Sequence, residues 1–144
     1  MGINSKLLAF QKLGITVERD AANPFFKSRY TSLNQVLEKV KKPLNDAGVL
    51  IVQRAGNLEG PEPFTGIWTE LIDTEDDSKV SSFVPFVAAT DMQKLGSSIS
   101  YARRYALISL LCLEDSDDDG ESAISPRKEG KGVGDMTKEP DFNL

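Results

Sequence analysis

The chain of 144 residues lacks histidine and contains a single cysteine, Cys112. Without histidine, the commonest general base and the histidine-containing zinc sites are excluded. One cysteine cannot build a four-cysteine zinc site, a Cys–His nucleophile pair or a disulfide within the chain. No G-x-x-x-x-G-K-[ST] loop occurs, which argues against a phosphate-loop NTPase. From these absences we expect no metal, no cofactor and no enzymatic reaction.

Long apolar runs are also missing. The longest, Ala106–Leu113 with Ser109 inside it, is far shorter than the ~20 residues that a membrane-spanning helix needs. The N-terminal sequence MGINSK has no basic-then-apolar signal pattern, and Lys6 stands where a myristoylation signal has serine or threonine. We therefore expect a cytoplasmic protein without a membrane partner.

The net charge of −5 is distributed unevenly along the chain. Residues 114–144 hold ten acidic and four basic side chains, a net charge of −6, whereas residues 1–113 have a net charge of +1. The acidic segment has too few apolar residues to offset its ordering entropy by burial. We divide the chain into a folded domain, residues 1–113, and a disordered acidic tail, residues 114–144. Because the tail carries the negative charge, the domain remains free to bind nucleic acid.

The stretch from Asp91 to Leu113 combines helical spacing with side chains suited to nucleic acid. One face is apolar at 3.6 residues per turn, and the opposite face is polar. The apolar face consists of Leu95, Ile99, Ala102, Ala106, Leu110 and Leu113. The polar face consists of Gln93, Lys94, Ser97, Ser100, Tyr101 and Arg104, with Arg103 on its flank. Cations, hydroxyls and a ring on one face are typical of a surface that holds phosphates and stacks bases.

Two more helices are predicted before this stretch. Apolar spacing indicates a short helix over Ile3–Leu13 and a longer one over Thr31–Ala47. Ser32 and Gln35 form a capping box at the start of the longer helix.

Three strands are predicted between the helices. They cover Val49–Gln53, Thr65–Ile72 and Val80–Val87, and the first is continuously apolar, as expected of a strand covered on both faces. Sequential strands usually pair with one another. The order predicts an α+β domain with helices packed on one face of a three-stranded antiparallel β-meander.

Two segments of the chain resemble the ERF family, the phage essential recombination function proteins that anneal single strands. The matching segments are NPFFKSRYTSLNQVLEKVKKPLNDAGVLIVQ at 23–53 and QKLGSSISYARRYALISLLCLEDSDDDGE at 93–121. The run GSSISYARRYAL followed by an acidic cluster is a specific signature. The chain departs from the family at Ala47, near which a histidine is expected.

The resemblance implies ATP-independent single-stranded DNA binding and annealing of complementary strands in phage-type homologous recombination, inside a bacterial host. It implies a homo-oligomer, either a ring or a filament, and a β-β-β-α core that agrees with the order of elements predicted above. The candidate DNA-binding residues are Lys94, Ser97, Ser100, Tyr101, Arg103 and Arg104, together with Lys27, Arg29, Tyr30, Lys41 and Lys42. The acidic tail is then either a solubilising extension or a docking segment for a single-strand-binding protein or an exonuclease.

Other interpretations stay open for several of these residues. Tyr105 has the spacing of a core aromatic, Arg103 has the alternative of an acidic partner in a neighbouring subunit, and the lysines fit a solvated helix face. A metal-dependent nuclease would use Pro61-Glu62 with Asp77-Ser78-Lys79, or the cluster Asp117–Asp119. A passive coat that binds single strands without annealing them is a further alternative.

Overall fold

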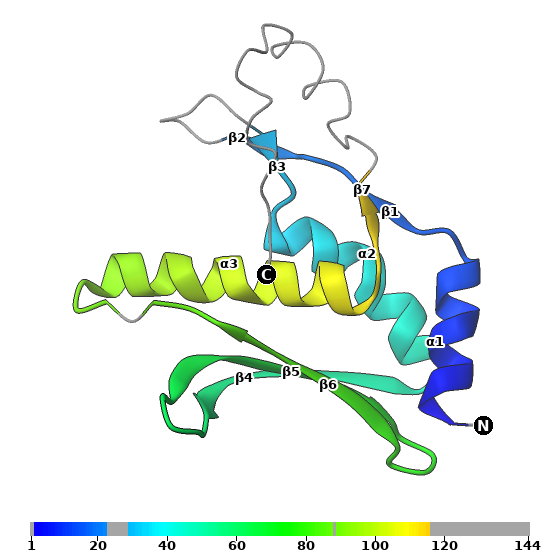
Figure 1. Cartoon of the computed structure of the whole chain (residues 1–144). Helices are drawn as coiled ribbons and strands as arrows, with labels where there is room; N and C mark the ends of the chain where they lie inside the picture. Colours follow the sequence, from blue (N-terminus) through cyan, green and yellow to red (C-terminus); the bar gives the residue numbers. More distant parts are fainter. Residues whose placement is uncertain (1, 23–28, 88, 116–144) are drawn as a thin grey trace, which may run out of the picture.

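A three-stranded antiparallel sheet forms the base of the fold, and two long helices lie on one of its faces (Figure 1). The computed structural model describes residues 2–22, 29–87 and 89–115. Strands β4 (Val49–Leu58), β5 (Phe64–Asp73) and β6 (Lys79–Pro85) follow one another in the sheet, with β5 in the centre. The predicted α+β class, with helices on one face of a β-meander, is confirmed.

Alternation along β5 separates a buried face from an open one. Ile67, Thr69 and Leu71 are buried toward the helices, whereas Trp68 and Glu70 point to the other side. No element of the described chain covers that second face (Figure 1). The expectation that the first strand is covered on both faces is therefore wrong, and Leu50 in β4 is 46% exposed.

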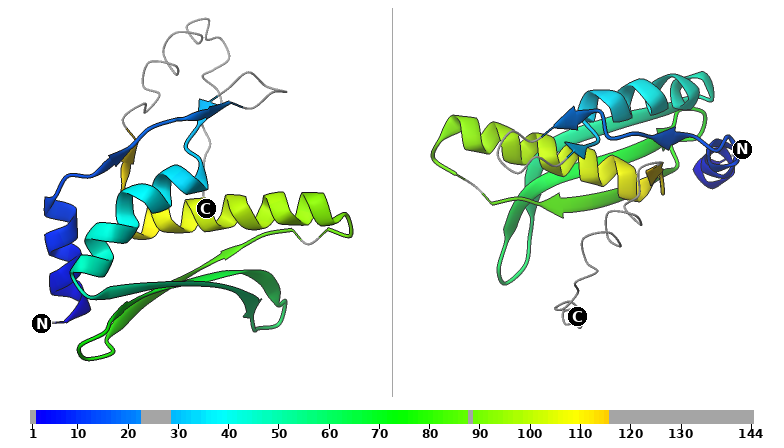
Figure 2. Two further views of the ribbon diagram at one scale, coloured as in Figure 1. Left: turned by 180° about the vertical axis from the view of Figure 1, so that it is seen from behind. Right: turned by 90° about the horizontal axis from the view of Figure 1, so that it is seen from above.

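Helices α2 (Leu33–Asp46) and α3 (Met92–Leu110) lie side by side over the sheet, as the view from above shows (Figure 2). The shorter α1 (Ile3–Lys12) stands at one end of the sheet. The core cluster joins all of these elements through Ile3, Phe10, Val17, Val36, Val40, Leu44, Val49, Leu71, Leu107 and Leu111. Within the described residues, no helix is long and apolar enough to cross a bilayer.

The starts of the two long helices are capped by side chains. Ser32 Oγ accepts a hydrogen bond from the Gln35 N–H, and Asp91 accepts one from the Gln93 N–H. The capping box is only half formed, because the Gln35 side chain accepts from the Glu18 N–H instead. Gln35 thus ties the start of α2 to the preceding loop.

Four two-residue strands lie on the side of the helices away from the sheet (Figure 1). β1 (Thr16–Val17) pairs in parallel with β7 (Glu114–Asp115), and β2 (Ala21–Ala22) pairs antiparallel with β3 (Arg29–Tyr30). The sequence patterns missed all four. Glu114 and Asp115, assigned to the tail from composition, thus belong to a strand, and the remaining tail lies outside the described residues.

A buried ion pair attaches α1 to the sheet. Lys6 Nζ donates to Asp73 Oδ1 at 2.7 Å, and both side chains are buried. This hydrogen bond raises the pKa of Lys6 and lowers the pKa of Asp73. The pair therefore stays ionised throughout the neutral range and fixes the position of α1.

Candidate nucleic-acid interface

Arg104 lies in the second half of α3, and only 8% of the residue is exposed. Its guanidinium carbon lies 4.9, 4.8 and 5.2 Å from the ring centroids of Tyr30, Tyr101 and Tyr105. We call these four residues the Arg104 cluster. The prediction that Arg104 belongs to an exposed polar face is wrong, because three rings, one of them from distant β3, surround its side chain.

The positive charge of Arg104 has no negative partner in the described part of the chain. No carboxylate there forms an ion pair with the guanidinium, and its N–H groups donate to no acceptor there. Cation–π contacts are worth about 0.5–2 kcal/mol, whereas an unpaired buried ion loses considerably more hydration energy. The cluster therefore favours the approach of an anion.

Tyr101 and Tyr105 present half-exposed rings beside this charge. They are 54% and 46% exposed, and their centroids lie 4.6 Å apart in an edge-to-face arrangement. The hydrogen bond between their hydroxyls, 3.4 Å long, raises the pKa of Tyr101, so the ring stays neutral at physiological pH. The expectation that Tyr105 is a core aromatic is wrong, because its position on α3 faces solvent. Both rings are available for stacking.

Tyr30 reaches Arg104 because the β2–β3 ribbon is held against the start of α2. Asp20 accepts hydrogen bonds from the N–H and the hydroxyl of Ser32, at 2.8 and 2.9 Å. Burial raises the pKa of Asp20, but these bonds outweigh burial and lower it. Arg29 donates to the Arg19 carbonyl oxygen at 2.7 and 3.1 Å, which closes the ribbon. In this conformation Arg29 stabilises the β2–β3 ribbon and thereby positions the ring of Tyr30.

An open apolar hollow lies beside the tyrosine pair, between the end of β6 and α3. Its volume is about 560 Å³. The lining residues are Val84, Pro85, Phe86, Val87, Ser97, Ser98, Tyr101, Ala102 and Tyr105. Two of the three rings that contact Arg104 are thus also walls of this hollow.

Arg103 points toward the sheet and bonds to Gln53. Its Nε donates to Gln53 Oε1 at 3.0 Å, and Gln53 Nε2 donates to the Arg103 carbonyl oxygen and to Thr69 Oγ1. Gln53 therefore bridges β4, β5 and α3 and sets the height of α3 over the sheet. The sequence pattern assigns no role to Gln53, although a polar residue at an inward-facing position of an apolar strand indicates a buried hydrogen-bonding partner.

The other predicted contacts on α3 differ in exposure. Lys94 and Ser97 are exposed, and Ser97 also lines the hollow. Ser100 is half-buried and does not line it. A side chain added at Gly96 would meet nothing within 4 Å, so this position is open to an approaching strand.

The lysines of α2 lie apart from the Arg104 cluster. Lys41 is exposed, and Lys42 donates to Asp46 at 2.8 Å, a bond that raises the pKa of Lys42. Both lie more than two turns along α2 from the end next to Tyr30. The predicted contact at Lys27 lies outside the described residues.

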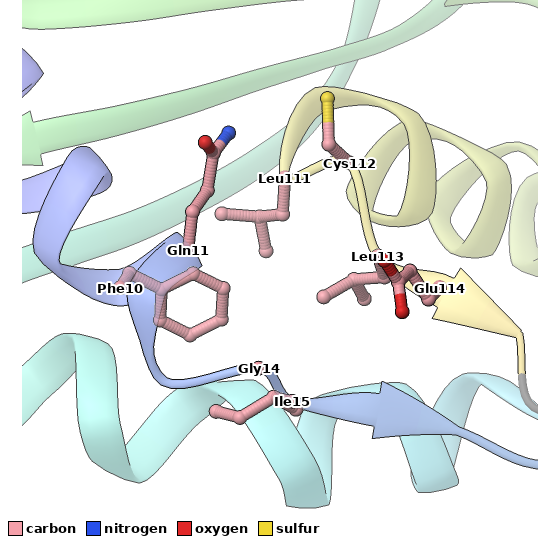
Figure 3. Close-up of a pocket in the computed structure, with 8 residues that line it drawn as sticks. All are labelled: Phe10, Gln11, Gly14, Ile15, Leu111, Cys112, Leu113 and Glu114. Carbon is pink, nitrogen blue, oxygen red and sulfur yellow. The ribbon is translucent and has the colours of Figure 1, made fainter.

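A second hollow, of about 220 Å³, lies where α1, β1 and the end of α3 meet (Figure 3). The ring of Phe10 and the side chains of Leu111 and Leu113 surround it, and the Cys112 sulfur points away from its centre. No lysine or arginine lines it. It therefore offers less to a nucleic acid than the Arg104 cluster does.

The residues of the nuclease alternative are not brought together. Glu62 lies in the turn between β4 and β5, and Asp77 lies in the turn between β5 and β6. These turns are at opposite ends of the ten-residue strand β5, about 30 Å apart at 3.3 Å per residue. Among the described residues, no three acidic or cysteine side chains gather into a metal-binding group. Asp117–Asp119 lie outside them.

The protein is a small α+β domain whose long helix α3 carries the nearly buried Arg104 and the half-exposed rings of Tyr101 and Tyr105. The chain belongs to the ERF superfamily, whose family model matches residues 3–138. The match confirms the resemblance drawn from the two sequence segments. Comparisons with curated proteins and with solved structures gave no match.

Proposed function

We propose that this protein binds single-stranded DNA and anneals complementary strands without ATP, in homologous recombination of the phage type. One observation carries the proposal: Arg104 is nearly buried among tyrosines and has no carboxylate partner in the described chain. A phosphate of the DNA backbone is the anion that such a charge favours, and the adjacent rings suit unpaired bases. Membership of the ERF superfamily supports the same function.

Annealing breaks no covalent bond, so the protein has only to neutralise phosphates, order the bases and release the duplex. Arg104 and the exposed Lys94 would contact phosphates, and the Ser97 hydroxyl would add a contact that does not depend on base sequence. Tyr101 would stack a base, an interaction worth about 1–3 kcal/mol. Each neutralised phosphate contributes about −0.7 to the slope of log affinity against log salt concentration.

A homo-oligomer, as a ring or a filament, is part of the proposal. One Arg104 cluster binds few phosphates, whereas repeated copies give additive contacts along a strand. The sheet has two unlike free edges, at β4 and β6, which suits head-to-tail association. The acidic tail would dock a single-strand-binding protein or an exonuclease.

The experiment mixes the full-length protein with complementary labelled oligonucleotides, without ATP, in either Mg²⁺ or EDTA. We expect duplex formation to accelerate in EDTA as much as in Mg²⁺. Strand cleavage that requires Mg²⁺ would instead indicate the nuclease. Binding without faster pairing would indicate a passive coat, and the absence of binding would refute the proposal altogether.

A further inference from the structure

The apolar hollow between the end of β6 and α3 has dimensions and walls that suit a flat aromatic guest. We propose that it receives one unpaired nucleobase of the strand whose phosphate lies at Arg104. This inference rests on the proposed function, because it assumes that the bound anion is a nucleic-acid phosphate. It goes further by assigning an inward orientation to the base.

The first argument for a base in the hollow is the short distance between the hollow and the charge of Arg104. Tyr101 and Tyr105 line the hollow, and their centroids lie 4.8 and 5.2 Å from the Arg104 guanidinium carbon. The charge and the hollow are thus one ring apart, comparable with the separation of a phosphate and the base of the same nucleotide. A strand can place its phosphate on Arg104 and its base in the hollow at the same time.

The second argument is the chemistry of the residues that line the hollow. Val84, Pro85 and Phe86 supply apolar surface, and the volume of about 560 Å³ falls within the usual range for small-molecule sites. Ser97 and Ser98 supply hydroxyls, which both donate and accept hydrogen bonds. A base of any identity finds partners there, so the hollow should tolerate all four bases.

The end of β6 that borders the hollow, unlike the rest of the β6 edge, disfavours the main competing occupant, a strand of a neighbouring copy. The Phe86 N–H donates inward to the Thr65 carbonyl oxygen at 3.0 Å, so the nitrogen of Pro85 faces the free edge. Proline has no N–H, and the edge beside the hollow therefore lacks a donor that a pairing strand needs. A guest that stacks and needs no ladder of hydrogen bonds fits better.

The test compares two single-stranded oligonucleotides of equal length, one with normal bases and one with regularly spaced abasic sites, on the full-length protein. We expect the abasic strand to bind about 5- to 150-fold more weakly, which corresponds to 1–3 kcal/mol for one stacked base. A strand containing 2-aminopurine should change its fluorescence on binding, because its base stacks on tyrosine. Equal affinity of the two strands would overturn the base pocket while leaving strand binding intact.

The second part of the test fills the hollow with a larger side chain. Ser98→Met should reduce the affinity for the normal strand to that for the abasic strand and abolish the 2-aminopurine signal. Ser5→Met, at an exposed serine of α1, is the matched control and should change neither. If Ser98→Met alters sedimentation but preserves the difference between the strands, the hollow holds a neighbouring copy and the inference fails. If neither strand binds the wild type, the proposed function itself fails.

Discussion

Arg104 keeps a permanent charge at a position from which water is largely excluded. Such a residue stabilises the free protein less than an apolar side chain of the same size would. The three tyrosines hold the guanidinium in one place, so little conformational entropy is lost when a phosphate arrives. At the scale of the residue, the cluster is organised for binding in advance.

Two substitutions of Arg104 distinguish the contribution of its charge to DNA binding from that of its planar shape. Arg104→Met removes the cation, and the slope of log affinity against log salt concentration should become less steep by about 0.7 for each phosphate lost. Arg104→Lys keeps the charge and should keep the slope, with weaker binding because an ammonium does not stack as a planar guanidinium does. The measurement is single-strand affinity at several salt concentrations. An unchanged slope for Arg104→Met would remove Arg104 from the interface.

The chemistry of the cluster could be predicted from the sequence, but its geometry could not. The run from Tyr101 to Tyr105 indicates a helix with cations and rings. Periodicity within α3 placed Arg104 on the open side, because it contains no information about what covers that side. Tyr30, more than seventy residues earlier, supplies the third ring. Such long-range packing has no signature within a single helix.

Elements are positioned by contacts that their own sequences do not reveal. The helices and the last two strands of the meander could be predicted from regular spacing or alternation, and the first strand from its continuous apolar run. The strands of two residues could not, because two residues have no period. The predicted first strand ends too early, at Gln53, whereas β4 continues to Leu58. Gly56 and Asn57 lie within this extension, and both residue types are uncommon in strands.

Two glycines give opposite predictions for the same substitution. A Cβ at Gly66 in β5 would lie 2.7 Å from Pro85 Cα and 2.8 Å from Phe83 Cζ, and would meet the Val84 carbonyl oxygen. Gly66→Ala should therefore destabilise the fold by about 1–3 kcal/mol, as overpacking does. Gly96→Ala, within α3 and in open space, should stabilise it by about 1 kcal/mol. Urea unfolding of both variants measures the difference, and equal midpoints would contradict the packing at Gly66.

The ion pair between α1 and the sheet predicts the pH range of stability. Asp73 has a lowered pKa, so its contribution is complete above the unfolded-state pKa of about 3.9 and is lost as pH falls through the folded value. Lys6 has a raised pKa, so its contribution is complete below about 10.4 and is lost as pH rises through the folded value. Stability should be level between these limits.

Replacing one partner of the pair tests this account. Asp73→Asn leaves the buried Lys6 with only its longer contact to Glu75, at 3.6 Å, so the urea midpoint at pH 7 should fall clearly and its acid dependence should flatten. Asp46→Asn breaks the exposed pair with Lys42 and serves as the control, with a midpoint close to that of the wild type. A larger effect at Asp46 than at Asp73 would contradict the importance of the buried pair.

At the scale of the whole molecule, the last strand of the described chain, β7, pairs with β1, which directly follows the first helix α1. The domain boundary predicted from the sequence, after Leu113, leaves β7 outside the domain. A chain that ends after Leu113 should be less stable than one that ends after Asp115, by about 1–2 kcal/mol, the value of one or two backbone hydrogen bonds. Thermal or urea unfolding of the two truncations measures this. Equal stability would indicate that β7 adds nothing to the domain.

The pairing of β1 with β7 also has a consequence for the order of folding. It joins positions about a hundred residues apart, so the closure of this long loop costs more entropy than any hairpin of the meander. During synthesis, β1 leaves the ribosome early but has no partner until residues 114 and 115 follow. The ribbon that carries Tyr30 continues directly from β1, and so the Arg104 cluster should be among the last parts of the domain to assemble.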